Sequence, residues 1–168
     1  FSALTRHTGF MCDWRADVWS SVLVGPDGKV TCIDLQQKMI ESLIKRATKA
    51  GLSNRIETRV CRDNSLTLDD LKEEIDFAIA FYVVHEISDV SGFFSQIYKT
   101  IKPDGRLFVA EPVGYVSKKD FDTTVFAAQQ NGLEVIDRPE IRRTYAVVLG
   151  KKKTSQIGRL VNRENFPR

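Results

Sequence analysis

Short apolar runs alternate with stretches of helical periodicity from residue 29 onward. The runs at residues 30–33, 56–61 and 76–81 have the length and composition of strands. Between the first two, apolar side chains recur every three or four residues, at Met39, Ile40, Leu43, Ile44 and Ala47. Gly51 marks the end of that predicted helix. Strands alternating with helices are typical of βαβ units, so the pattern predicts an α/β fold.

Residues 101–110 join a predicted helix to a predicted strand. Phe93, Phe94 and Ile97 supply the apolar face of this helix. The helix must end near Ile101, because Pro103 cannot donate a helical hydrogen bond. We expect Gly105 to adopt the positive φ of a tight turn. Residues 107–110 are apolar without alternation, which suits a strand covered on both faces.

The remaining pattern predicts two helices and two strands. Residues 68–74 can form a brief helix, capped by Thr67 or Asp69. A longer helix starts at Ser117 or Asp120 and ends before Gly132. Residues 133–136 and 144–149 are predicted as strands on either side of a turn at 137–140.

Composition narrows the class of protein further. The 168 residues suffice for one domain, with 42% hydrophobic and 28% charged residues, as in a soluble globular protein. A net charge of +3 is too small to indicate nucleic acid as an obligatory partner. The sequence shows neither a signal peptide nor an apolar run of about 20 residues that would span a membrane. Three cysteines without a CxxC pair predict no disulfide framework and a reducing, cytoplasmic compartment. No metal site is expected.

Asp34 closes the strand at 30–33 and has two interpretations. A carboxylate at the carboxyl end of such a strand can accept hydrogen bonds from ribose hydroxyls, in the crevice where doubly wound sheets bind ligands. Leu35 could then pack against an adenine face. Alternatively, Asp34 caps a helix that starts at Leu35.

The turn "KPDG" at 102–105 and the unit ending in Asp34 resemble class I, Rossmann-like S-adenosylmethionine-dependent methyltransferases. In that family an acidic residue closes the second strand and a "KPGG"-like turn opens the fifth. The segment "NGLEVIDRPEI" is similar to the family's "AGF-x-V" segment. Over residues 25–152 the resemblance implies a doubly wound, mostly parallel sheet, with helices on both faces and a C-terminal antiparallel hairpin. It also implies S-adenosylmethionine as methyl donor and S-adenosylhomocysteine as product.

The resemblance extends to a cofactor site. Asp63 matches the acidic residue that binds the adenine amino group in the family's "G-D-A-x-x-L" segment, and Asn64 stands beside it. Alternatively, the segment that contains Asp63 and Asn64 is only a turn, since turns are commonly rich in Asp and Asn. After the strand at 76–81, the resemblance implies that Ala80 and Phe81 touch the cofactor.

His85 and Glu86 match the segment that lines the donor and acceptor pockets in similar proteins. An imidazole could remove a proton from the acceptor. Many methyl transfers need only proximity and alignment, so a structural His85, bonded to Glu86 or backbone, is an equal alternative. Glu111 either lines the acceptor pocket or caps the segment after it.

The N-terminal part departs from the family. A "G-x-G-x-G" loop should precede Asp34, but residues 7–14 contain one glycine, Gly9. Residues 1–5 resemble the helix that normally follows the loop, and residues 17–24 would be the end of that helix or a replacement first strand. We expect another segment or a second chain to fill the central strand, through strand exchange or a homodimer. The predicted domain spans 1–152, with 1–24 atypical, and 153–168 form a basic, solvated extension.

Three functions remain open from the sequence. The first is methyl transfer to a small-molecule nucleophile, with His85 and Glu86 as catalytic residues. The second is a non-catalytic methyltransferase-like domain, truncated or altered, that has lost cofactor affinity. The third, an NAD-dependent oxidoreductase, also requires a glycine fingerprint before Asp34 and explains the turn at 102–105 less well.

Overall fold

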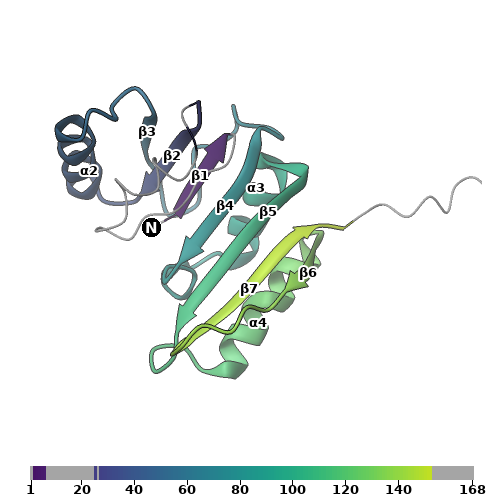
Figure 1. Cartoon of the computed structure of the whole chain (residues 1–168). Coiled ribbons are helices and arrows are strands. Elements are labelled where there is room, and N and C mark those ends of the chain that lie inside the picture. The colour runs from purple at the N-terminus through teal and green to yellow at the C-terminus, as the bar shows by residue number, and fades with distance from the viewer. Residues whose placement is uncertain (1, 7–24, 26, 153–168) are drawn as a thin grey trace, which may run out of the picture.

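The fold is built on one seven-stranded sheet (Figure 1). The computed structural model describes residues 2–6, 25 and 27–152. The strands follow the order β3-β2-β1-β4-β5-β7-β6 across the sheet. Their bounds are β1 (Ser2–Arg6), β2 (Lys29–Asp34), β3 (Ile56–Val60), β4 (Ile75–Phe81), β5 (Ile101–Pro112), β6 (Leu133–Asp137) and β7 (Thr144–Lys151).

Five of the seven strands run in the same direction, and β1 and β7 run in the opposite direction. β2 pairs parallel with β3, and β4 pairs parallel with β5. Because β1 is antiparallel to both β2 and β4, these two halves run the same way. β7 is antiparallel to β5 and β6, which forms the predicted C-terminal hairpin. The carboxyl ends of β2, β3, β4 and β5 therefore meet at one edge of the sheet, where ligands bind in doubly wound folds.

β1 fills the centre of the sheet, and the expectation of a helix over residues 1–5 is wrong for residues 2–5. Its register places Ser2 opposite Ile33 on one side and Ala80 on the other. Without β1, the facing edges of β2 and β4 would leave backbone groups unpaired in the middle of the sheet, and a five-residue strand satisfies both rows. A segment of this chain thus takes the central place. The expectations for residues 7–24 and 153–168 lie outside the described residues.

Helices lie on both faces of the sheet, as predicted, and α2 (Gln37–Lys49) lies over β2 and β3. It packs on one face, where Leu43 meets Val30 and Cys32 of β2. Ile33 points to the other face and joins the main core beneath α3 (Val90–Thr100) and α4 (Lys118–Gln130). This alternation along β2 is the two-residue period of a strand with helices on both sides. The doubly wound α/β class is confirmed.

Residues 68–74 form turns, so the predicted short helix is wrong. Glu73 has a φ of 53°, in the left-handed region that ends a helix. Its backbone N–H donates to the carbonyl of Lys99 (3.0 Å), and that of Glu74 donates to Thr100 (3.0 Å). These bonds satisfy the last carbonyls of α3, which local helical bonds would leave unpaired. Leu68 and Leu71 are nevertheless buried in the main core.

A side chain would not fit at position 105, which explains the glycine there, and the expected positive φ is wrong. Its φ lies outside the left-handed region, but a Cβ there would lie 2.9 Å from the carbonyl oxygen of Ile75. The pairing shifts from Ile75–Ile101 to Phe77–Arg106, so residues 102–105 form a bulge at the start of β5. α3 ends at Thr100, before Pro103, as predicted.

Candidate functional site

A cavity of about 210 Å³ opens at the edge where the parallel strands end. Four segments form it: the end of β2, the loop after β3, the 3-10 helix η1 (Val84–Glu86) with the residues that flank it, and the first half of α3. The sequence-predicted residues that line it are Asp34, Leu35, Asp63, Asn64 and Glu86. These come from three elements that are far apart in the chain, and strand order alone brings them together.

Asp34 is a buried carboxylate, 8% exposed, at the wall of this cavity. Its Oδ1 accepts a hydrogen bond from the backbone N–H of Gln36 (2.6 Å), and its Oδ2 accepts none from the described residues. Burial raises the pKa of Asp34 above its ordinary value, partly offset by the Gln36 bond. α2 starts later, at Gln37, with Gln36 at its N-cap position, so Asp34 does not cap that helix.

The loop after β3 presents Asp63 and Asn64 at the tip of a tight turn. Arg62 and Ser65 exchange two backbone hydrogen bonds (2.9 and 3.1 Å) at its base. Cys61 ties the loop to β2 by donating its backbone N–H to the carbonyl of Asp34 (2.9 Å). Both carboxylates therefore face the same cavity, Asp34 from its buried wall and Asp63 from its exposed rim.

Gln96 anchors this loop to α3, and sequence reasoning missed it. Its side-chain Oε1 accepts from the backbone N–H of Leu66 (2.8 Å), 30 residues away in sequence. Its Nε2 donates to the carbonyls of Gly92 (3.3 Å) and Asn64 (3.5 Å). The only sequence signal is a polar residue within a mostly apolar helix face.

Ala80 and Phe81 lie outside the cavity. Ala80 is fully buried in the main core, while Phe81 stacks on Tyr82 with ring centroids 3.9 Å apart. Their expected contact with a cofactor remains a prediction.

His85 also lies outside the cavity lining, and its partner is Glu111, not Glu86. Glu111 is the penultimate residue of β5, beside the end of β4, and is 1% exposed. Its Oε1 accepts from the backbone N–H groups of Val84 (2.7 Å) and His85 (3.3 Å). Its Oε2 hydrogen-bonds Nδ1 of His85. From the sequence, Glu111 was expected to line the acceptor pocket or to cap the segment after it, and its pairing with His85 was not predicted.

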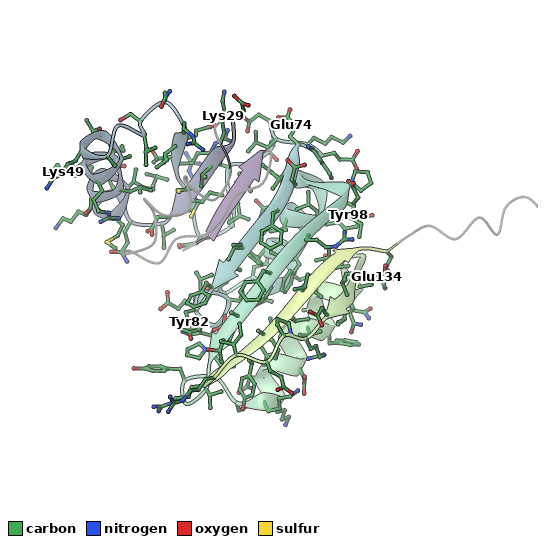
Figure 2. The ribbon with its side chains drawn as sticks, viewed as in Figure 1. Lys29, Lys49, Glu74, Tyr82, Tyr98 and Glu134 are labelled. Atoms are coloured by element: carbon green, nitrogen blue, oxygen red, sulfur yellow. The ribbon has the colours of Figure 1, made fainter. Side chains whose placement is uncertain are left out.

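An exposed rim of side chains follows β4 and β5 on the same edge. Figure 2 shows Tyr82 at the end of β4. Tyr82 has a φ of 57° and hydrogen-bonds Thr144 of β7 through its hydroxyl (2.7 Å). Val113 and Tyr115, in the loop after β5, are exposed, the latter at 87%. The edge thus has two parts: the acidic cavity beside β2 and β3, and the His85–Glu111 pair with its aromatic rim beside β4 and β5.

The described residues contain neither a membrane-spanning helix nor a cluster of metal-binding side chains. No helix among them is long and apolar enough to cross a bilayer. No group of three or more histidine, cysteine or acidic side chains among them is arranged to hold a metal ion.

Comparison with known proteins identifies what this chain resembles. A family model described as a methyltransferase domain matches residues 9–164. A demethylmenaquinone methyltransferase from Lactobacillus johnsonii is 25% identical over 88 residues, covering 52% of this chain and 35% of the relative. One from Listeria monocytogenes is 25% identical over 100 residues, covering 58% of this chain and 40% of the relative. The chain thus spans little more than a third of these curated relatives.

Solved structures share the fold. A SAM-dependent methyltransferase from Aquifex aeolicus superposes with a TM-score of 0.67 at 21% identity, covering 77% of this chain and 72% of that one. The [4+2]-cyclase SpnF superposes with a TM-score of 0.56 at 22% identity, covering 65% of this chain and 44% of that one. At these identities the structural likeness establishes the fold alone.

Proposed function

The chain belongs to the methyltransferase domain family, and from this premise we propose that it transfers a methyl group from S-adenosylmethionine to a small-molecule nucleophile. The observation that supports this most strongly is the pair of carboxylates, Asp34 and Asp63, facing one cavity at the carboxyl edge of the sheet. Both are acceptors, and an adenosine group presents ribose hydroxyl and amino donors to match them.

The described residues fit the adenosine part of the donor. Asp34 has an oxygen that accepts no hydrogen bond from the described residues, and we assign it to the ribose hydroxyls. Asp63 would accept from the adenine amino group, with Asn64 beside it. Leu35 lines the cavity and is 53% exposed, so its side chain is available to a ring face. Ala80 and Phe81 are proposed to contact the donor beyond the cavity.

The acceptor is proposed to bind over the ends of β4 and β5. When bound, the donor supplies a methyl group already activated on a sulfonium, so the protein needs to align the acceptor and remove its proton. His85, 27% exposed in its side chain, stands on this side and is assigned as the base. Glu86 lines the cavity and is assigned to the donor side. The curated relatives named above support a small-molecule acceptor.

A non-catalytic methyltransferase-like domain is the second candidate. Two observations favour it: residues 7–14 contain one glycine, and the central strand runs antiparallel to β2 and β4. Residues 7–14 thus lack the glycine pattern that lets a backbone approach the donor's methionine end in similar proteins. The likeness to a [4+2]-cyclase illustrates that the fold also serves other chemistry. The family match favours both candidates over an NAD-dependent oxidoreductase.

A labelled transfer assay distinguishes the two candidates. The protein is incubated with methyl-tritiated S-adenosylmethionine and a panel of hydroquinones, phenols, thiols and amines. We expect labelled product with at least one acceptor class, and a loss of at least about tenfold in Asp34→Ala, which removes a charge-assisted hydrogen bond. Absence of labelled product together with absence of S-adenosylmethionine binding would favour the non-catalytic domain, which has lost cofactor affinity. Cytoplasmic location and homodimerisation remain predictions.

A further inference from the structure

Gln96 is a polar side chain of α3 that forms part of the cavity wall and bonds to the loop opposite. It lines the cavity together with Asp63 and Asn64, which belong to the loop after β3. Its Oε1 accepts from the backbone N–H of Leu66 (2.8 Å), and its Nε2 donates to the carbonyl of Asn64 (3.5 Å). One amide group on α3 therefore contacts the loop on both sides of its turn.

The tip of this loop has few other attachments. A backbone pair closes the turn at residues 62–65. Neither the side chain of Asp63 nor that of Asn64 forms a hydrogen bond with another described residue. Leu66 follows the turn directly and packs, partly buried, against the main core. The direction in which Asp63 is presented therefore depends on how the chain is held at Leu66, and Gln96 is the side chain that bonds there.

The two ends of the Gln96 amide differ in strength. The bond from the Leu66 N–H to Oε1 has an ordinary length of 2.8 Å, whereas the bonds from Nε2 to the carbonyls of Gly92 and Asn64 are longer, at 3.3 and 3.5 Å. A partly buried N–H that loses its acceptor pays the cost of desolvation as well as the lost bond. The acceptor oxygen is therefore the part of Gln96 that fixes the loop.

We infer that Gln96 is a positioning residue, which holds Asp63 toward the adenine amino group and so makes the cavity selective for that group. This inference rests on the proposed function, in which Asp63 accepts from the adenine of the donor. A carboxylate that is already held in place binds the amino group without the cost of ordering its loop, and this preorganisation strengthens binding. Purine riboside carries a hydrogen in place of the amino group, so it gains nothing from a positioned Asp63.

Two substitutions separate the acceptor oxygen from the rest of the side chain. Gln96→Leu keeps a side chain of similar size but removes the acceptor for Leu66. Gln96→Glu keeps an oxygen that accepts from Leu66 and loses only the two longer bonds made by Nε2. Thr100→Val is the control on the same helix. It removes the bond from the Thr100 hydroxyl to the carbonyl of Gln96 (2.7 Å), and Thr100 does not line the cavity.

Hydrogen exchange in the ligand-free protein tests the anchor itself. We expect the Leu66 amide to exchange about tenfold or more faster in Gln96→Leu than in the wild type, because its acceptor is gone. In Gln96→Glu and in Thr100→Val the rate should stay within about threefold of the wild-type rate. A Leu66 amide that exchanges at the wild-type rate in Gln96→Leu would overturn the inference.

Titrations with adenosine and purine riboside test the selectivity, which a purely structural role would not change. We expect the wild type to bind adenosine about fivefold or more tightly than purine riboside. This ratio should fall below about twofold in Gln96→Leu and persist in Gln96→Glu and Thr100→Val. A loss of stability alone would leave the ratio unchanged.

The same titrations distinguish this inference from the proposed function. Affinity for S-adenosylhomocysteine should fall by about fivefold or more in Gln96→Leu, in step with the loss of selectivity. If the wild type distinguishes the two nucleosides and Gln96→Leu does so equally well, the inference alone is overturned. If the wild type binds no S-adenosylhomocysteine, the proposed function fails and the inference fails with it.

Discussion

The charged form of Asp34 destabilises the folded protein. Its carboxylate is buried, and burial raises its pKa because the charged form loses hydration. A folded-state pKa above the unfolded value means that protonation favours the folded state. At neutral pH the charge therefore costs stability. Such a residue is expected where binding, and not packing, requires the charge.

Asp34→Asn should separate these two effects. The amide oxygen can still accept from Gln36, so the variant should be more stable than the wild type at pH 7. The difference should shrink as pH falls through the raised pKa, and vanish below the ordinary value of 3.8. Affinity for S-adenosylhomocysteine should fall by about 10-fold or more, since a charge-assisted hydrogen bond contributes about 1.5–3 kcal/mol.

Thermal unfolding between pH 7 and about pH 3 measures the stability effect, and calorimetry measures affinity. Asp27→Asn, at an exposed position, is the control and should change neither. A variant that is less stable than the wild type at pH 7 would contradict the assignment of Asp34 as a charge that the fold tolerates for binding.

Individual site residues differed in how far the sequence could predict them. Asp34 and Asp63 were predictable because strand ends on one edge converge, and both line the cavity. Gln96 and the partner of His85 were not, since their hydrogen bonds span 30 and 26 residues. Such contacts depend on the packing of α3 and the pairing of β4 with β5, which one sequence does not specify locally.

At the scale of elements, the α4–β6 junction depends on one glycine. Gly132 has a φ of 87°, and an added Cβ would lie 2.9 Å from the ring of Tyr98 on α3 (Figure 2). Its carbonyl also accepts from the backbone N–H of Lys152 (3.0 Å). The residue thus reverses the chain after α4 and lets α3 pack closely against the turn.

Gly132→Ala should destabilise the protein by about 2–4 kcal/mol, of which about 1–2 kcal/mol is the left-handed backbone and the rest the contact with Tyr98. Gly51→Ala is the matched control, because Gly51 has a φ of 71° but open space around its Cβ position. It should cost only the backbone part. Urea unfolding of both variants measures the difference. Equal losses would show that Tyr98 does not restrict the junction.

Elements with strong periodicity were predictable, and those shaped by distant backbone bonds were not. The segments α2, α3 and α4 and the terminal hairpin follow the sequence pattern closely. The turns at 68–74 replace a predicted helix because Glu73 and Glu74 bond to the end of α3. β1 was missed because its five residues gain their place only from the two strands beside it.

At the scale of the whole molecule, the antiparallel β1 sets the central question. It fills the place between β2 and β4. The cavity beside β2 and β3 therefore lies on the same continuous sheet edge as the ends of β4 and β5. β1 also places Ser2, the first described residue, at the carboxyl edge of the sheet between Ile33 and Ala80. We propose that the cavity of Asp34 and Asp63 binds the donor although the central strand is antiparallel to its neighbours.

Titration of the protein with S-adenosylhomocysteine by calorimetry, with the oligomeric state followed in the same sample, tests that claim most directly. We expect one site per chain in the micromolar range, weakened by about tenfold or more in Asp34→Ala and in Asp63→Asn. Absence of binding at millimolar ligand would contradict it and leave a methyltransferase fold without its donor. Binding that neither substitution weakens would contradict the assignment of this cavity.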